Sequence, residues 1–332
     1  MLNPQTSSSA PALTHEPRQA DERVWDNALW ASSQRGILTI AIPTFRDDAV
    51  PMIEALATCE RFGDVEIVLF DDGGGDEALV QAFVAAGDTT SCAMRVVSAA
   101  HNAGRSVARN RLISHARSNW LLLLDADMLP DAPDFLTQYI SRIEADAEPG
   151  LIVGGFSLKQ APQTREFALH RWQAARSECL SAAERNVDPG RFAYTSNVLA
   201  HRDVLTKISF DENFSGWGWE DVDWGLRIAQ IAPVIHLDNP ATHMGLDTAA
   251  NLMAKYGKSG PNFAYALSKH PTHLEPTPLG RHSRRLAQWP NAIRAPLKAL
   301  SGAIARNEAL PAAMRGNGLK LWRALIYAEA LS

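Results

Sequence analysis

The chain of 332 residues contains few cysteines and no long apolar run, and both absences narrow its class. Its three cysteines, Cys59, Cys92 and Cys179, form no Cys-x-x-Cys pair. This argues against a disulfide framework or a cysteine-based zinc site and fits a reducing compartment. Uninterrupted apolar runs such as residues 120–124 are too short to cross a bilayer. The N-terminus lacks the pattern of a secretory signal, so a cytoplasmic location is expected.

The chain also lacks an excess of positive charge. It carries 32 Lys and Arg against 37 Asp and Glu, a formal net charge of −5. That balance gives no indication of a nucleic-acid-binding protein. The hydrophobic share of 46% and the charged share of 21% are ordinary for a soluble globular enzyme.

Composition divides the chain into three segments. Residues 1–35 are rich in Pro, Ser, Ala and charge, and they are predicted to be a mostly disordered leader, with a short docking helix at Val24, Leu29 and Trp30. Residues 36–270 are expected to form the catalytic domain. Residues 271–332 are expected to form a basic helical tail, because nine Arg or Lys but only two Glu occur after residue 277. This tail could contact the inner face of a membrane peripherally, pack on the catalytic domain or form an oligomer contact.

Short, nearly continuous apolar runs alternate with helical stretches in the catalytic segment. Strands are predicted at residues 37–42, 65–70, 94–97, 120–124, 151–155 and 233–237, and an amphipathic helical region at 160–186. Runs buried on both faces indicate an α/β fold with a mainly parallel, Rossmann-like sheet flanked by helices. Such sheets bind ligands beyond the carboxyl ends of their strands. Residues 36–156 are expected to bind a nucleotide and residues 157–270 an acceptor.

Two carboxylates follow the strand predicted at 120–124. Asp125 and Asp127 are separated by one alanine, and hard oxygen ligands of this kind suit Mg²⁺ or Mn²⁺ with a diphosphate completing the shell. A cation would also relieve the repulsion between the two acids. The alternative is that one of them only caps a helix.

Two further motifs follow predicted strands. Asp71 and Asp72 precede three glycines, where backbone can approach a ligand closely and an acid can accept from a base or ribose hydroxyl. Asn102 opens a strand-to-helix passage that carries Arg105 and Arg109 on one helical face, suited to a pyrophosphate or a base. A tight turn without a ligand and ordinary surface arginines are the alternatives.

The segment Gly216–Asp223 combines tryptophans, glycines and acids. Indoles such as those of Trp217 and Trp219 stack on pyranose rings, and carboxylates such as Glu220 and Asp221 bind hydroxyls or remove a proton from one. A helix N-terminus followed by core tryptophans is the alternative. His243, after the last predicted strand, is a candidate ligand for the same divalent ion, with a structural role as the alternative.

Taken together, these motifs resemble glycosyltransferase family 2 and related inverting GT-A enzymes. The resemblance rests on Ile42-Pro-Thr-Phe-Arg46, Asp71-Asp-Gly73, Asn102-x-Gly-x(4)-Arg-Asn110, Asp125-x-Asp127 and Trp217-Gly-Trp-Glu-Asp221. The resemblance covers residues 37–265. Within the family, the chain resembles the galactosyltransferase and chondroitin-polymerase subgroup. Arg46 and Gly74-Gly75 depart from the usual family pattern, which leaves the base and the donor sugar open.

The resemblance implies a role for each motif. Pro43, Thr44 and Arg46 would line the nucleotide pocket, and Asp71 or Asp72 would contact the base, usually uracil. Asp125 would touch the ribose or donor sugar. Asp127 and His243 would bind the metal ion. Asp221 would act as the general base, and Glu220 would bind the acceptor.

The expected function is therefore inverting, metal-dependent transfer of a sugar from a nucleotide sugar, with UDP as the expected nucleotide, to a glycan or other hydroxyl acceptor. Surface polysaccharide or glycoconjugate synthesis would use such a reaction. A non-catalytic carbohydrate-binding or assembly protein and a nucleotidyltransferase are the alternatives. Every expected acid is present, which argues against the first, and the absence of a glycine-rich loop after the first predicted strand argues against the second.

Overall fold

The computed structural model describes residues 21–32 and 34–332. The first twenty residues of the expected leader therefore lie outside the described residues. Residues 22–26, which also fall in that expected leader, form an edge strand, so Val24 is in a strand and not in the expected helix. Leu29 and Trp30 are helical as expected, in α1 (Ala28–Ser32). No helix among the described residues combines the length and the apolarity needed to cross a membrane.

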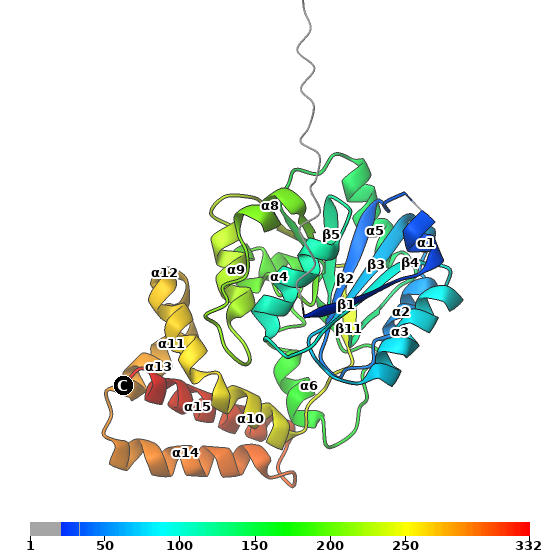
Figure 1. Ribbon diagram of the computed structural model, residues 1–332. Helices are drawn as coiled ribbons and strands as arrows, with labels where there is room; N and C mark the ends of the chain where they lie inside the picture. Colours follow the sequence, from blue (N-terminus) through cyan, green and yellow to red (C-terminus); the bar gives the residue numbers. More distant parts are fainter. Residues whose placement is uncertain (1–20, 33) are drawn as a thin grey trace, which may run out of the picture.

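The core of the fold is an eight-stranded, mostly parallel sheet with helices on both faces (Figure 1). In spatial order its strands are β1 (Glu22–Asp26), β4 (Ala93–Ala99), β3 (Val65–Asp71), β2 (Leu38–Thr44), β5 (Trp120–Leu124), β9 (Asn197–His201), β7 (Leu151–Val153) and β10 (Val234–His236). A second sheet contains β6 (Met128–Pro130), β11 (Ala241–His243) and β8 (Phe156–Ser157). The six strands predicted from apolar runs are all confirmed.

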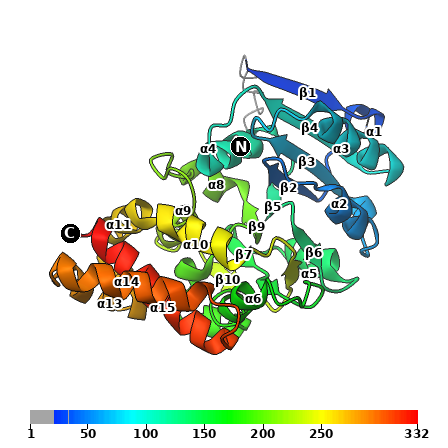
Figure 2. The same cartoon turned by 90° about the horizontal axis from the view of Figure 1, so that it is seen from below.

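Helices α1 to α9 lie around the sheet or, in the case of α6, between it and a helical layer formed by α10 to α15 (Figure 2). The first group is α1 (Ala28–Ser32), α2 (Val50–Ala57), α3 (Glu77–Thr89), α4 (Arg105–His115), α5 (Phe135–Glu144), α6 (Ala168–Ala174), α7 (Ala182–Arg185), α8 (Arg202–Lys207) and α9 (Glu220–Ile228). The second group is α10 (Ala249–Lys258), α11 (Gly260–Lys269), α12 (Pro271–Leu274), α13 (Pro278–Ala287), α14 (Asn291–Arg306) and α15 (Ala312–Ala330). Short 3₁₀ turns occur at Phe62–Asp64 and Pro189–Phe192.

Alternate residues of the central strands enter two separate cores. On β2, Ile40 and Ile42 face the core beneath α2, α3 and α5, whereas Ala41 faces the core beneath α4 and α9. This two-sided burial explains the continuous apolar runs of the sequence. The region at 160–186 differs from expectation, because only α6 and α7 are helical there. Ser181 begins α7 with a capping box, so the two helices are separate.

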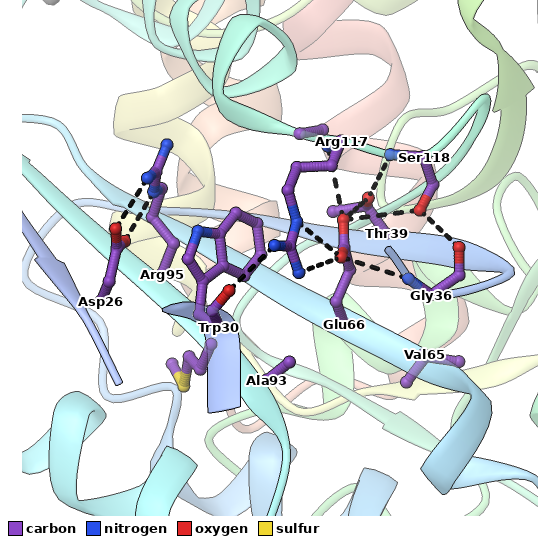
Figure 3. A network of polar contacts seen from close by, with 12 residues as sticks. Asp26, Trp30, Gly36, Thr39, Val65, Glu66, Ala93, Arg95, Arg117 and Ser118 are labelled. Carbon is purple, nitrogen blue, oxygen red and sulfur yellow. Dashed lines mark hydrogen bonds and ion pairs between the residues drawn. The ribbon is translucent and has the colours of Figure 1, made fainter. Parts of the chain in front are cut away.

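A buried ionic network fixes the N-terminal segment to the amino end of the sheet (Figure 3). Glu66 is fully buried and accepts hydrogen bonds from Thr39 Oγ1 at 2.6 Å and Arg117 Nη2 at 2.7 Å. The Arg117 guanidinium lies 3.8 Å from the centroid of the Trp30 ring and donates to the Trp30 carbonyl. Arg95, paired with Asp26 of β1, faces the same indole. The network lies at the opposite end of the strands from the predicted site.

Candidate active site

The predicted acids stand at the carboxyl end of the sheet. β3 ends at Asp71, and Asp125 comes directly after the end of β5. Pro43 and Thr44 end β2, which lies between those two strands. The polar side chains predicted from separate motifs therefore occupy adjacent strand ends, where open α/β sheets bind ligands.

Asp71 and Asp72 are both buried and build the loops around them. Asp71 accepts from Gly74 N at 2.9 Å and from Ser98 Oγ at 2.8 Å. Asp72 accepts from Ala103 N, Gly104 N and the Asn102 side chain, each at 2.9 Å. These bonds tie the two predicted nucleotide-binding loops together. The arrangement gives Asn102 a fixed position beside the strand ends.

The glycine turn after Asp72 is required by close packing. Gly73 has φ +70°, and a Cβ there would lie 2.3 Å from the carbonyl carbon of His101. Arg46 lies across from this turn, and its backbone is in the left-handed region (φ 65°). Its side chain is exposed, with the guanidinium 4.9 Å from the Phe45 ring centroid. No carboxylate partner is seen for Arg46 within the described part of the chain. Its charge is therefore available to a ligand.

Asp125 is held by two arginines and a serine. Arg109 Nη2 donates to one carboxylate oxygen at 2.8 Å, and Ser196 Oγ donates to the other at 2.7 Å. Arg105 Nη2 lies 3.6 Å from that second oxygen. Burial opposes ionisation, but Arg109 and Arg105 outweigh it and lower the pKa of Asp125. Asp125 is thus a fixed anion with its oxygens already contacted by cationic and hydroxyl donors.

Arg105 and the 195–196 loop connect this strand end to the Trp-Gly-Trp-Glu-Asp motif. Arg105 Nε donates to Glu220 Oε1 at 2.7 Å. Thr195, the neighbour of Ser196, donates through Oγ1 to Asp221 at 2.8 Å. Two independent links therefore bring the acids of α9 beside Asp125, although the motifs are almost a hundred residues apart in sequence.

The environment of Asp221 favours its protonated form. Burial raises the pKa of Asp221 to about 6, and the adjacent negative charge of Glu220 adds to the effect. Arg109 and Arg105 act in the opposite direction. A carboxyl group that loses its proton near neutral pH is suited to general base catalysis.

Strand pairing brings Asp127 and His243 together. β11 pairs antiparallel with β6 so that His243 lies opposite Met128, the residue after Asp127. His243 Nε2 is 3.2 Å from Asp127 Oδ2. Burial disfavours the charged ring, but Asp127 outweighs it and raises the pKa of His243 to about 9. A Cβ on Gly245 would lie 1.9 Å from Asp127 Oδ2, so only glycine leaves room for this pair.

His170 and Glu178 extend this cluster. Ligand atoms of His170, Glu178 and His243 all lie within 4.8 Å of one another. His170 Nδ1 accepts from Asp247 N at 2.7 Å, so in a neutral ring the other nitrogen carries the proton. Burial lowers the pKa of His170 to about 4, which keeps the ring neutral. His170 therefore acts as a donor in this arrangement, whereas Glu178 adds an acid beside His243.

The predicted acceptor tryptophans pack on the C-terminal helices. The Trp217 ring meets Tyr256 of α10 edge-on, with centroids 5.2 Å apart. Trp219 Nε1 donates to Tyr327 Oη of α15 at 3.2 Å. Both indoles are only partly buried. Trp219 itself has φ 79°, an unusual backbone state for a tryptophan, so the loop that leads into α9 is tightly constrained.

Two polar residues near these motifs have structural roles. His236 contacts Arg185 and the Pro189 carbonyl, and it lies away from the Asp127 pair. Asp223 is fully buried and pairs with Arg227, Lys269 and His270, which fastens α11 to α9.

Four contributing residues were not predicted: Thr195, Ser196, His170 and Glu178. Thr195 and Ser196 lie directly before β9, whose apolar run is 198–200. Because β9 runs antiparallel to β5, polar residues before β9 lie at the same edge of the sheet as polar residues after β5. No comparable pattern marks His170 or Glu178, because their relation to His243 exists only in three dimensions.

A profile of the glycosyl transferase family 2 matches residues 39–207, more than half of the chain. The chain belongs to this family. As a family 2 member it is an enzyme of the glycosyltransferase class, which sets aside the non-catalytic and nucleotidyltransferase alternatives. A comparison with curated proteins gave no match.

Other proteins with solved structures share the fold of this glycosyltransferase. The chain is similar to mannosyltransferase PcManGT from Pyrobaculum calidifontis, which was solved with GDP-Man and Mn²⁺. The two share 15% identity with a TM-score of 0.55, and the match covers 91% of this chain and 90% of PcManGT. S. aureus TarS 1–349 matches at 12% identity and a TM-score of 0.48, covering 88% of this chain and 90% of that one. The observed elements and the similarity to PcManGT confirm the expected α/β fold with a helical C-terminal region.

Proposed function

We propose that this family 2 glycosyltransferase uses a nucleotide-sugar donor and a divalent metal to glycosylate a hydroxyl acceptor with inversion. The observation that carries the proposal is the pair of links joining three motifs. Arg105 contacts both Asp125 and Glu220, while Thr195 and Ser196 join Asp221 to Asp125. The binding and basic groups of the proposed reaction are thereby held in one place.

The residues around Asp127 fit a divalent metal. Asp127 and His243 supply an oxygen and a nitrogen ligand, and Asp125 is two residues away. His243 Nδ1 is buried without a hydrogen-bond partner among the described residues, so this ring is not fully satisfied by the protein alone. When bound, Mn²⁺ or Mg²⁺ would neutralise charge on the departing nucleoside diphosphate. Glu178 lies close enough to complete or tune the site.

Asp221 is the proposed general base. Its ionised carboxylate would take the proton of the acceptor hydroxyl as that oxygen attacks the anomeric carbon. One direct displacement inverts the anomeric configuration. Glu220, neutralised by Arg105, is proposed to bind the acceptor, and the partly exposed indoles of Trp217 and Trp219 would provide apolar surface for a sugar ring.

The donor is proposed to bind over the ends of β2 and β3. Pro43, Thr44, Arg46, Asp71, Asp72, Asn102 and Arg109 line or shape this region, together with Arg105 and Asp125. We propose UDP as the nucleotide from the family resemblance. PcManGT, solved with GDP-Man, shows that the fold also accommodates a guanine nucleotide in another protein. A surface polysaccharide or glycoconjugate is the proposed acceptor class.

The proposal is tested with a panel of UDP- and GDP-sugars, each with and without Mn²⁺. At a hundredfold excess over Kd, the correct donor should stabilise the protein by about 2.7 kcal/mol, seen as a higher melting temperature. Asp127→Asn should remove the Mn²⁺-dependent part, whereas Asp88→Asn on the exposed face of α3 should not. Equal stabilisation of wild type and Asp127→Asn would contradict the metal assignment. Retained anomeric configuration in the product, measured by NMR, would exclude inversion.

A further inference from the structure

The outer surface of α14 is apolar, although this helix is the outermost of the C-terminal layer. It packs on α15, with a smaller contact to α10, and lies at the edge of the molecule (Figure 1). Ile293 is 50% exposed and Leu300 is 60% exposed. The other exposed positions of α14 are Ala292, Ala295, Pro296, Ala299 and Ala303, with the polar Asn291 and Arg306 at its two ends. Residues 293, 296, 300 and 303 follow helical spacing and form one continuous face.

The charged residues of α14 before its last turn point the opposite way. Arg294 is 9% exposed and donates to Ser332 Oγ and the Ala328 carbonyl of the C-terminal end. Lys298 pairs with Glu329 of α15. An ordinary surface helix turns its apolar side inward and its charges outward. The reversed arrangement on α14 leaves an apolar face in contact with solvent, which costs free energy unless something covers it.

Positive charge and an exposed indole flank this helix along the chain. Arg281 and Arg285 are exposed on α13, and Arg306 is exposed at the end of α14. Trp289, in the turn between α13 and α14, is 46% exposed. Tryptophan prefers the interface between lipid headgroups and acyl chains, and basic residues are attracted to anionic headgroups.

We infer that the apolar face of α14, from Trp289 to Ala303, docks on an anionic membrane surface. The helix would lie in the plane of the interface, with Ile293 and Leu300 among the upper acyl chains and the arginines at the headgroups. The charge complementarity selects a lipid surface over a second copy of this chain, because two such faces would bring like charges together. None of the exposed residues of this face belongs to the candidate active site described above, so the docking test does not depend on the proposed chemistry.

The test is co-sedimentation of the full chain with vesicles of phosphatidylcholine containing 30% phosphatidylglycerol. Wild type should sediment with these vesicles and far less with pure phosphatidylcholine. Ile293→Asp with Leu300→Asp should weaken partitioning by about tenfold or more, because charge is placed in the acyl layer. Arg281→Gln with Arg285→Gln should weaken it about fivefold per charge, the equivalent of about 1 kcal/mol each.

Matched variants serve as controls. Val187→Asp with Ile231→Asp changes two exposed apolar residues that lie outside the C-terminal layer. Arg142→Gln with Lys207→Gln changes two exposed cations that also lie outside it. Both should sediment like wild type, and all variants should keep the wild-type melting temperature. Unchanged sedimentation of Ile293→Asp with Leu300→Asp would overturn the inference. So would a dimer in light scattering that dissociates in this variant without any vesicle binding by wild type.

Discussion

The half-buried Asp221, as the proposed general base, should set the pH dependence of the enzyme. A general base works only when ionised, and burial raises the pKa of Asp221 to about 6. The rate should therefore fall as pH drops through 6 and level off above it. Thr195 donates to Asp221 and stabilises the ionised form, so Thr195→Val should shift this acid limb to higher pH. Initial rates at saturating donor between pH 5 and 8 measure both effects.

Asp221→Asn provides the matching loss of function. The asparagine keeps an oxygen that can accept from Thr195, so the fold should survive while kcat falls by about 10² to 10⁴. Near-normal turnover with an unchanged melting temperature would remove Asp221 from the role of base.

His243 should govern metal affinity. His243→Ala deletes one of the two proposed ligands in the Asp127 pair and should weaken Mn²⁺ binding by about tenfold or more. Titration of free Mn²⁺ followed by electron paramagnetic resonance measures this without any substrate. His282→Ala, on the exposed surface of α13, is the control. Equal Mn²⁺ affinity in His243→Ala and wild type would contradict the assignment.

At this scale, the sequence marks residues that belong to local motifs and leaves the others unmarked. His243 was related to Asp127 through the family resemblance. The structure brings the two side chains to 3.2 Å, and their role as metal ligands stays a prediction. Thr195 and Ser196 escaped notice because they precede their strand. Since β9 runs antiparallel to β5, its start lies beside the carboxyl end of β5, and polar residues there also reach the site.

Among elements, the N-terminal strand and helix depend on one buried carboxylate. Glu66 is fully buried and its main cationic partner is Arg117. Arg117→Met should leave that charge without compensation and lower the free energy of unfolding by about 3 to 5 kcal/mol. It also removes the cation over Trp30, which anchors α1. Urea denaturation measures the loss.

Arg142→Met is a suitable comparison, because Arg142 is exposed on α5 and surface changes of this kind usually stay within about 0.5 kcal/mol. A similar, small effect in both variants would show that the network adds little stability. Donor binding should be retained in folded Arg117→Met, since the network lies at the far end of the strands from the site.

The central strands of the sheet were easier to predict than its edge strand β1. Strands buried on both faces produce continuous apolar runs, so β2, β3, β4 and β5 were evident. β1 has a polar edge-strand sequence, Glu-Arg-Val-Trp-Asp, and its place depends on pairing with β4 far along the chain. Such long-range pairing leaves no local periodicity to detect.

For the whole molecule, the C-terminal helices hold the loop that leads into α9, because Trp217 contacts α10 and Trp219 contacts α15. Tyr327 of α15 is fully buried, accepts from Trp219 Nε1 at 3.2 Å and Arg323 Nε at 3.1 Å, and shares a 2.7 Å hydrogen bond with Ser259. Of the alternatives open from sequence for the tail, packing on the catalytic domain describes α15. We propose that the catalytic unit therefore continues beyond residue 270 into this helix.

Tyr327→Phe tests that continuity without disturbing the apolar packing. Removing the hydroxyl leaves Trp219 Nε1 and Arg323 Nε without their acceptor, which should lower stability by about 1 to 3 kcal/mol. It also releases the Trp219 loop that leads directly into Glu220 and Asp221. The KM for acceptor should rise while donor affinity and donor hydrolysis stay near wild type, because Asp127 and His243 lie on other elements. If donor and acceptor kinetics changed equally, Tyr327 would support the fold as a whole, and the proposed link from α15 to the acceptor loop would be wrong.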